Sequence, residues 1–421
     1  MANTFNIALL ADPHIDYSYS TKTDDKGVNL RVRDGYNALK EIVNDIIANK
    51  DTVDIVVIAG DLFHTSHPTI RSIAIVQHLL RQLAKEQIPV HVLAGNHDST
   101  DDRSYPAAVA VTHDPDRNIF AYYHPYTVVN VHNGINLHVL AHHGLHADDA
   151  PVLSPVEGEI NILTTHGAAV DPTNATLMRC LDSPREQIIP PEVVIDENFH
   201  LKMLGHYHSR HAVGGDVNLN TWYAGSTLRR GCSDAPGARG RTLFKIHDSG
   251  VVEHEHHNIF QRPQYDLEVI DASNMTAKSI EDLVISNLAA TQNGVGSGEF
   301  DPLNAPIVRQ RVINATRSIR AGIDRKNVSS AQKHTLEYKL EMIRPENSIK
   351  VIQDVFNEKQ EEAEVNEAPT INNASTATLD VMKAFTSWKG NSNVLKEIAQ
   401  EYKAPVSVKA QGFLKQAKDQ D

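Results

Sequence analysis

The sequence predicts an α/β fold in which a larger N-terminal domain is followed by a smaller α/β domain and C-terminal helices. Short apolar runs alternate with amphipathic helical patterns, which is the signature of strand–helix–strand units. Several of these runs end in a glycine, a carboxylate or a histidine. Of the 23 histidines, 22 lie between His14 and His257, so the two parts of the chain differ in composition.

The totals limit the class of protein. The chain has 421 residues, enough for two or three domains and at least one sizeable core. Its net charge of −13 argues against a generally nucleic-acid-binding surface, although bound cations or local basic patches can reverse the field at a site. Only Cys180 and Cys232 are present, which argues against a disulfide framework and favours a reducing cytoplasm. We also expect no signal peptide and no membrane-spanning segment.

The first element predicted is a strand over residues 6–11, which ends in Asp12-Pro13-His14. Side chains at i and i+2 of an extended backbone point the same way, so Asp12 and His14 can hold one ion together. Taken alone, this pair fits a surface turn better. Residues 22–33 are polar and predicted as a loop, and apolar residues at helical spacing predict a helix over 36–47.

A strand–helix–strand unit is predicted next. The apolar run 53–59 ends in Gly60-Asp61-Leu62-Phe63-His64, where the glycine permits a tight turn that aims Asp61 into a cleft. An amphipathic helix over 70–85 follows, and then a short buried strand over 89–94. That strand ends in Gly95-Asn96-His97-Asp98. Ligands bind preferentially beyond the carboxyl ends of such strands.

Further strands are predicted downstream. Residues 128–132 and 135–140 form a predicted hairpin, because the Asn133-Gly134 pair between them is a strong turn signal. A strand over 159–165 ends at His166, and a strand over 200–204 ends in Gly205-His206-Tyr207-His208. Residues 221–226 and 241–246 are predicted as two more strands.

The loop between the last two predicted strands carries Arg229 and Arg230 and runs through Arg239. Clustered arginines suit phosphate oxygens, but a solvated loop explains them equally well. Some histidines have no comparable context and fit chance enrichment on the surface; they are His113, His124, His132, His142 and His143.

We divide the chain into residues 1–262, 263–356, 357–377 and 378–421. Strands at 265–270 and 306–313, with helical patterns at 280–288 and 332–343, predict a small α/β domain in the second range. The third range is acidic, then polar, and is predicted as a linker. Apolar helix faces at 379–402 are too small to form a core alone, so they dock on a partner or on the chain's own body.

The strand ends together supply carboxylate, imidazole and amide groups but no thiolate. This mixture suits Mn²⁺, Fe²⁺ or Zn²⁺, and there are about enough ligands for two ions. Two ions ~3.5–4 Å apart activate a bridging water and neutralise a phosphoryl group. The residues are Asp12, His14, Asp61, Asn96, His97, His166, His206 and His208.

In this order, Asp-x-His, Gly-Asp, Gly-Asn-His-Asp, a single His and Gly-His-x-His resemble the motifs of the calcineurin-like metallophosphoesterases. Phosphatases of that superfamily usually carry Gly-Asp-x-x-Asp-Arg-Gly. Gly60-Asp61-Leu62-Phe63-His64 is instead similar to the SbcD-type DNA double-strand-break repair exonuclease subunits, bacterial or phage. Tyr223-Ala224-Gly225-Ser226 is similar to that family's segment after the last ligand pair.

The resemblance implies a two-sheet sandwich flanked by helices, a small α/β capping domain that contacts DNA, and helices that bind an SbcC-like ABC-type ATPase. It implies a homodimer in the cytoplasm, of the host if the chain is phage-encoded, that cleaves DNA ends as an exonuclease and endonuclease. Mn²⁺ is the favoured metal, with Mg²⁺, Fe²⁺ or Zn²⁺ as alternatives.

The resemblance also implies roles for individual residues. Asp61 would bridge the two ions, and His97 would be catalytic instead of a ligand. His64 would lie near the substrate phosphate. The first ion would be held by Asp12, His14, Asp61 and His208, and the second by Asp61, Asn96, His166 and His206.

Two other functions fit the sequence. One is a phosphodiesterase or phosphatase for a small nucleotide, which would have no need of the second domain and the C-terminal helices. The other is a scaffold that tethers DNA ends, against which the complete ligand set argues.

Overall fold

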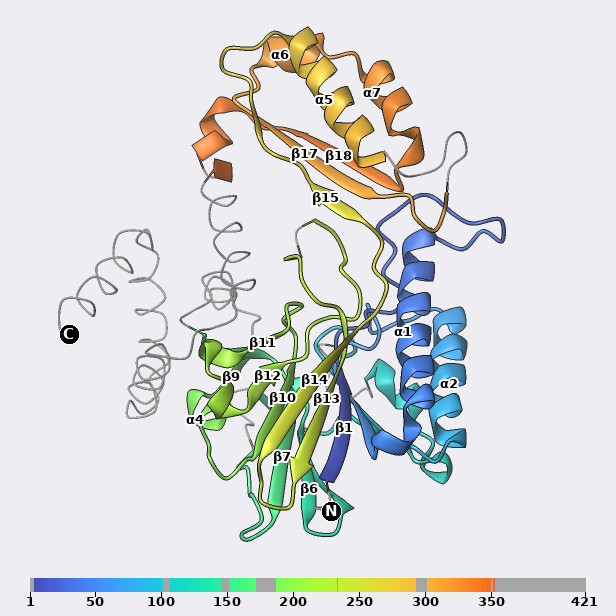
Figure 1. The fold of residues 1–421 in the computed structure, drawn as a ribbon, viewed down its shortest axis with the longest axis vertical. Coiled ribbons are helices and arrows are strands. Elements are labelled where there is room, and N and C mark those ends of the chain that lie inside the picture. Colours follow the sequence, from blue (N-terminus) through green and yellow to red (C-terminus); the bar gives the residue numbers. More distant parts are fainter. Residues whose placement is uncertain are drawn as a thin grey trace, which may run out of the picture.

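The computed structural model describes residues 4–100, 107–145, 151–171, 187–232, 234–292, 301–349 and 351–352. Within these ranges, two six-stranded sheets pack face to face, and a smaller four-stranded sheet lies beyond one end of the sandwich (Figure 1). The predicted linker at 357–377 and the predicted helices at 379–402 lie outside the described residues.

The first sheet has the order β14-β13-β1-β2-β3-β4. β1 to β4 run parallel, and β13 and β14 add an antiparallel edge. Its strands are β1 (Thr4–Leu10), β2 (Ile55–Ala59), β3 (Val90–Leu93), β4 (Ile119–Tyr122), β13 (Gly240–His247) and β14 (Val252–Asn258). β14 was not predicted, because its sequence of histidines and glutamates lacks an apolar face.

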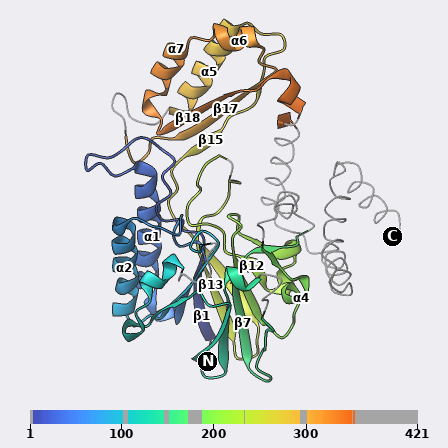
Figure 2. The same cartoon turned by 180° about the vertical axis from the view of Figure 1, so that it is seen from behind.

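The second sheet has the order β11-β12-β10-β7-β6-β5. Its strands are β5 (Tyr126–His132), β6 (Ile135–Leu140), β7 (Ile160–His166), β10 (Leu201–Gly205), β11 (His211–Ala212) and β12 (Thr221–Tyr223). The predicted β5–β6 hairpin is confirmed by the antiparallel pairing of the two strands. Gly134 in the turn has a φ of 72°, a left-handed conformation for which the Asn-Gly pair is well suited. α4 (Pro191–Val194) lies beside this sheet, as the rear view shows (Figure 2).

Two helices, α1 (Leu30–Ala48) and α2 (Ile70–Lys85), cover the outer face of the first sheet. α2 has the predicted bounds. α1 begins at Leu30, inside the stretch expected to be a loop, because the Asn29 side chain accepts hydrogen bonds from the first-turn amides of Arg31 and Val32 and so caps the helix.

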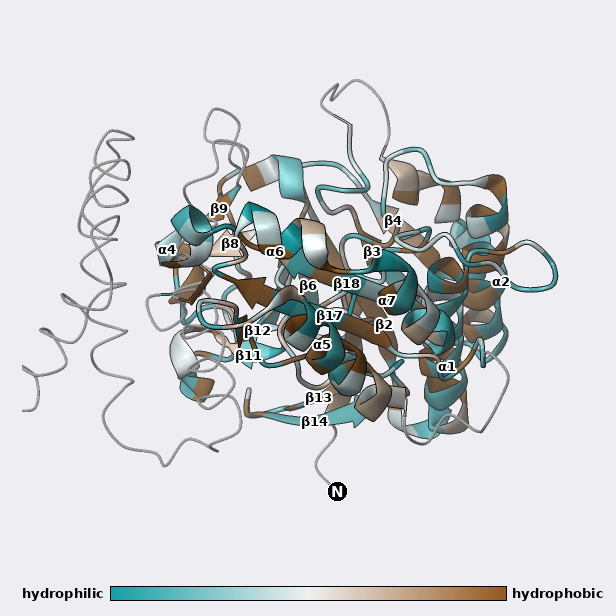
Figure 3. Cartoon of the chain, turned by 90° about the horizontal axis from the view of Figure 1, so that it is seen from above, coloured by the Kyte–Doolittle hydropathy of each residue, from teal (hydrophilic) through white to brown (hydrophobic). Residues whose placement is uncertain are grey.

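One hydrophobic core lies between the two sheets, and another lies between the first sheet and helices α1 and α2. The inner side chains of the first sheet, such as Ile7, Leu9 and Val57, are fully buried against those of the second, such as Leu137 and Ile162. Seen from above, the apolar strands, coloured brown, lie at the centre, and helices that carry both teal and brown residues lie around them (Figure 3). This layering is the two-sheet α/β sandwich that the family resemblance implies.

The smaller sheet contains β15 (Gln264–Asp266), β16 (Ile270–Asp271), β17 (Ile307–Ile313) and β18 (Glu337–Met342). One face is covered by α5 (Ala277–Gln292), α6 (Arg317–Gly322) and α7 (Arg325–Ala331). The single strand predicted at 265–270 is divided: β15 and β16 pair in succession with β17. α5 contains the helix predicted at 280–288.

The helix predicted at 332–343 is wrong. A 3₁₀ turn at Gln332–His334 leads into β18, whose Tyr338, Leu340 and Met342 pack on the core below α5. These apolar residues alternate with charged ones, so the segment has the period of a strand.

Short elements complete the fold. They are β8 (Ala168–Ala169), β9 (Ile188–Ile189) and 3₁₀ helices at Lys50–Thr52, Ala108–Thr112, Pro115–Arg117, His142–Leu145, Val213–Gly215 and Val217–Leu219. In the described part of the chain, no helix combines the length and the apolar character needed to cross a bilayer.

A buried histidine in β3 makes folding stability sensitive to acid. His91 is 4% exposed, and its Nδ1 lies 2.8 Å from the Tyr122 hydroxyl. Burial lowers the pKa of His91 from 6.5 to about 4. The neutral ring is therefore compatible with the fold above pH 6.5, and stability is lost as the pH falls through 6.5 toward 4.

We expect the free energy of unfolding to fall by about 2 kcal/mol between pH 7.5 and 5.0 on account of His91. Urea titrations of the His91→Gln variant should show a pH-dependent loss smaller by that amount. The same exchange at an exposed position outside the core, His78→Gln, is the control. An unchanged pH dependence in His91→Gln would contradict the prediction.

Candidate metal centre

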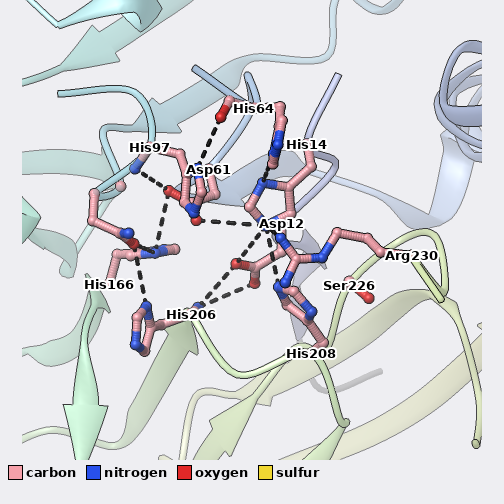
Figure 4. A network of polar contacts seen from close by, with 12 residues as sticks. Asp12, His14, Asp61, His64, His97, His166, His206, His208, Ser226 and Arg230 are labelled. Atoms are coloured by element: carbon pink, nitrogen blue, oxygen red, sulfur yellow. Dashed lines mark hydrogen bonds and ion pairs between the residues drawn. The ribbon is translucent and has the colours of Figure 1, made fainter. Parts of the chain in front are cut away.

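The predicted ligand residues converge at one end of the sandwich. Parallel strands of both sheets end there: β1, β2 and β3 in the first sheet, β7 and β10 in the second. Because the carboxyl ends of these strands meet, residues far apart in sequence become neighbours (Figure 4). They are Asp12, His14, Asp61, Asn96, His97, His166, His206 and His208.

Four of these residues have left-handed backbones, which non-glycine residues rarely adopt. Their φ angles are 50° at Asp12, 43° at His14, 49° at Asp61 and 104° at His206. Such conformations cost on the order of 1–3 kcal/mol each and persist where neighbouring structure fixes them. Here the Asp12 amide donates to the Gly60 carbonyl at 3.1 Å, and the His14 amide donates to the Asp61 carbonyl at 2.9 Å.

Two glycines permit the close approach of the strand ends. A Cβ on Gly205 would overlap the Ala59 carbonyl, and a Cβ on Gly95 would overlap the Asp61 carboxylate. Any other residue at either position would push the two sheets or the two loops apart. The glycines in the strand-end motifs therefore set how closely the ligands can gather.

One half of the cluster gathers around His14. Its Nε2 lies 3.1 Å from His208 Nε2, 3.6 Å from Asp61 Oδ2 and 3.9 Å from Asp12 Oδ1. The Asp12 carboxylate also accepts from the His206 amide at 3.1–3.2 Å. His14 and both carboxylates are almost completely buried.

The other half gathers around Asn96. Its Oδ1 lies 3.0 Å from His166 Nε2 and 3.2 Å from His206 Nδ1. His166 Nε2 is 3.4 Å from Asp61 Oδ1, and its Nδ1 donates to the Ala59 carbonyl at 2.9 Å. Asp61 thus contacts both halves, one carboxylate oxygen facing each.

The charges in this cluster are strongly perturbed. Burial raises the pKa of Asp12 to about 8. Burial would also raise the pKa of Asp61, but His166 and His14 hold it well below its usual range. Burial alone would lower the pKa of His166, yet the charge and the hydrogen bond of Asp61 raise it to about 10. At neutral pH Asp12 therefore mostly holds a proton, whereas Asp61 is ionised beside a protonated His166.

The donor set fits divalent metal ions. Three groups bring their ligand atoms within 4.8 Å of one another: Asp12, His14 and His208; Asp12, Asp61 and His166; and His14, His64 and His97. All are imidazole or carboxylate donors, which bind Mn²⁺, Fe²⁺ or Zn²⁺. The negative charge of Asp61 favours a proton on His166. A metal cation can replace that proton, since metal binding displaces protons from histidine ligands.

His97 and His64 lie side by side at the edge of the cluster. Their rings stack with centroids 5.1 Å apart, and His97 Nδ1 donates to the His64 carbonyl at 2.8 Å. The His97 amide donates to Asp61 Oδ1 at 2.9 Å. Burial, followed by the charges of His97 and Arg230, lowers the pKa of His64 to about 4, so its ring is neutral at neutral pH.

The two predicted arginines have different surroundings. Arg230 Nη1 is 3.5 Å from His14 Nε2, and its guanidinium lies over the Tyr17 ring. Arg229 points away, donating to the Asp234 carbonyl at 3.0 Å and to the Gln264 carbonyl at 3.5 Å.

Sequence reasoning missed three residues that shape this centre. Asp98, fully buried, accepts from the amides of Leu62, Phe63 and Gly95. Asp234 Oδ2 lies 3.2 Å from His208 Nδ1. His142, which we had set aside as lacking context, donates from Nδ1 to the His166 carbonyl at 2.9 Å. Only Asp98 had a signal, since it completes the Gly-Asn-His-Asp motif.

A model of the calcineurin-like phosphoesterases matches residues 5–239. The chain belongs to the calcineurin-like phosphoesterase family. The predicted family is therefore confirmed.

The relatives of this phosphoesterase include two archaeal proteins named DNA double-strand break repair protein Mre11. The protein of Archaeoglobus fulgidus is 38% identical over 93 residues, which cover 22% of this chain and 19% of the relative. The protein of Saccharolobus solfataricus is 26% identical over 204 residues, which cover 47% of this chain and 49% of the relative. The matched regions thus span half or less of these relatives.

Two phosphatases are among the solved structures that align with the chain. A dimetal phosphatase from Danio rerio aligns with a TM-score of 0.33 and 12% identity, over 58% of this chain and 93% of the phosphatase. A purple acid phosphatase from yellow lupin (Lupinus luteus) seeds aligns with a TM-score of 0.36 and 13% identity, over 60% of this chain and 52% of that enzyme.

Proposed function

We propose that this phosphoesterase is a two-metal-dependent nuclease that hydrolyses phosphodiester bonds at DNA ends in recombination and repair. The observation that carries the proposal is the central position of Asp61. Its Oδ2 lies 3.6 Å from His14 Nε2, and its Oδ1 lies 3.4 Å from His166 Nε2. A single carboxylate facing two ligand groups suits a bridge between two ions.

Two sets of residues would hold the ions. Bound there, the two ions would activate a bridging water and neutralise the phosphoryl group during in-line displacement. The first set is Asp12, His14, Asp61 and His208, and the second is Asp61, Asn96, His166 and His206. Mn²⁺ is the metal we propose, in agreement with the oxygen and nitrogen donors.

His97 is proposed as the catalytic histidine. Because the His64 carbonyl can only accept a hydrogen bond, His97 Nδ1 carries its proton. In the imidazolium form, the other nitrogen, Nε2, can then donate its proton to the leaving oxygen, which leaves a neutral ring with its proton on Nδ1. His64 and Arg230 flank the cluster and are proposed to contact the substrate phosphate, while Arg229 supports the loop that carries Arg230.

The names of the archaeal relatives favour DNA as the substrate. We propose that residues 263–356 form a capping domain that contacts DNA and that residues 378–421 bind an SbcC-like ATPase. We also propose that the chain works as a homodimer in the cytoplasm. An ATPase partner would add further DNA contacts, since a chain of net charge −13 has no generally attractive surface for DNA.

The test uses the purified chain with linear double-stranded DNA and bis-p-nitrophenyl phosphate, each with Mn²⁺, Mg²⁺ or EDTA. Degradation of DNA from its ends that requires Mn²⁺ is the expected result. Turnover of the small diester with DNA intact, even after addition of the ATPase, would favour a nucleotide phosphodiesterase instead.

Replacing His97 by alanine should reduce DNA cleavage by about 10²–10⁴-fold, the range that general acid catalysis contributes. Binding of both Mn²⁺ ions, measured by isothermal titration calorimetry, should be retained because His97 is not a ligand in this assignment. Loss of one ion with loss of activity would instead make His97 a ligand. In cells, a scaffold would keep its repair role in this variant, whereas a nuclease would lose it.

A further inference from the structure

A carboxylate lies directly behind one of the proposed metal ligands. Asp234 Oδ2 is 3.2 Å from His208 Nδ1, on the side of the ring away from the cluster, while His208 Nε2 faces His14 Nε2 at 3.1 Å. The same Asp234 oxygen accepts from the Arg230 amide at 2.9 Å. A carboxylate bonded to the outer nitrogen of a metal-binding histidine fixes its tautomer and ring orientation.

The loop that carries Asp234 is anchored by an arginine of α1. Arg31 Nη2 donates to the backbone carbonyls of Arg229 and Arg230, at 2.7 and 3.1 Å. The Arg31 side chain is fully buried. These carbonyls belong to the same turn as the Arg230 amide, which donates to Asp234. By fixing this turn, Arg31 fixes the position of Asp234 beside His208.

Arg31 belongs to a buried charged cluster, which we call the Arg31–Asp34–Arg262 cluster. Arg31 Nη1 donates to Asp34 at 2.7 Å. Arg262 binds the two oxygens of Asp34 with Nε and Nη2, both at 2.7 Å. Two guanidinium groups thus share one carboxylate, and the bidentate pair leaves little rotational freedom.

The cluster continues into the smaller α/β unit. Arg262 donates to the carbonyls of Ala305 at 2.8 Å and Pro302 at 2.9 Å, in the segment that leads into β17. Arg33 of α1 donates to the same Pro302 carbonyl at 3.1 Å. In Figure 1 the first turn of α1 faces this part of the smaller sheet. An unbroken series of contacts therefore runs from the loop before β17 to His208.

We propose that Asp234 is a positioning residue for His208 and that the Arg31–Asp34–Arg262 cluster couples it to the smaller α/β unit. The fit of residues 301–313 against α1 then sets how well His208 is oriented, and so how tightly one of the two metal ions binds. This inference rests on the proposed function, because it takes His208 as a metal ligand.

The test measures Mn²⁺ binding to the full chain by titration calorimetry, in the wild type and in the Asp234→Asn and Arg262→Lys variants. Each variant should bind one ion about 10-fold more weakly and the other ion normally. Lysine at position 262 keeps the charge but cannot bridge Asp34 and both carbonyls. In the double variant the loss should not exceed that of Asp234→Asn, because both changes act through one path.

Electron paramagnetic resonance provides a second readout. At Mn²⁺ concentrations that saturate the wild type, the variants should show the signal of an isolated Mn²⁺ ion in place of a coupled pair. A general loss of folding stability would not remove one ion selectively.

Asp45→Asn is the matched control. Asp45 also lies on α1 and pairs with a buried arginine, Arg241, at 2.5 Å, but at the other end of the helix. This variant should melt at a lower temperature and bind both ions as the wild type does. Equal weakening in Asp45→Asn would overturn the inference, because it would assign the effect to loosening of α1.

The remaining outcomes separate the parts of the proposal. Unchanged affinity in Asp234→Asn would overturn its positioning role, and unchanged affinity in Arg262→Lys would overturn the coupling. Wild-type protein that binds no Mn²⁺ would overturn the proposed function and this inference together, whereas wild-type binding with unaltered variants overturns the inference alone.

Discussion

The Asp61→Asn variant should hydrolyse phosphodiesters at least ~10³-fold more slowly than the wild type, because metal ions contribute several kcal/mol of transition-state stabilisation and each 1.36 kcal/mol is tenfold in rate. Asp61 is the residue that faces both ligand groups. A neutral amide cannot neutralise two cations. It can still accept the hydrogen bond from the His97 amide, so the loop should keep its conformation.

Rates with bis-p-nitrophenyl phosphate, at saturating Mn²⁺, test this prediction, and calorimetry on the same samples should show fewer than two bound ions. Asp216→Asn serves as the control, since Asp216 is a buried carboxylate that caps a 3₁₀ turn away from the cluster. Its activity should be normal. If the Asp61→Asn variant retained a tenth of the wild-type activity, Asp61 would not be the residue that bridges the two ions.

The largest loss of stability is expected for Asp98→Ala. Asp98 is fully buried and accepts from the amides of Leu62 at 3.2 Å, Phe63 at 2.9 Å and Gly95 at 3.0 Å. Alanine would leave three buried N–H groups without acceptors. At about 1–3 kcal/mol for each of the three amides, the free energy of unfolding should fall by about 3–9 kcal/mol.

Urea denaturation measures this loss. Asp324→Ala is the control, because Asp324 also accepts from a backbone amide, that of Lys326, but at an exposed helix N-terminus. Water can replace this bond, so the control should lose only about 1 kcal/mol. If the two variants proved equally stable, Asp98 would not be what ties the β2 and β3 loops together.

Local sequence patterns predicted much of the fold. The bounds of α2 follow from its amphipathic period, and the β5–β6 hairpin follows from Asn133-Gly134. Two strands escaped prediction. β14 is an edge strand whose side chains are mostly exposed, so it has no apolar pattern. β18 does alternate apolar and charged residues, but the helix predicted over 332–343 overlooked this short period of a strand.

The candidate site was predictable to the extent that it follows strand ends. The ligand residues lie at the ends of buried strands, which local sequence reveals: Asp12 and His14 after β1, Asp61 after β2, His166 as the last residue of β7, and His206 and His208 after β10. Asp234 lies in a loop, and its approach to His208 depends on Arg31, far away in the chain. No local pattern encodes a contact of that kind, so only the three-dimensional structure brings it to light.

The pairing of β1 with β13 sets the order in which the protein can mature during synthesis. Leu9 pairs with Thr242, so one edge of the central strand stays open until nearly the whole of the sandwich has been translated. At ~5–20 residues per second, that interval is on the order of 10–50 s. Nascent chains whose translation stops before β13 therefore lack a complete first sheet, whose strand ends carry Asp12, His14 and Asp61.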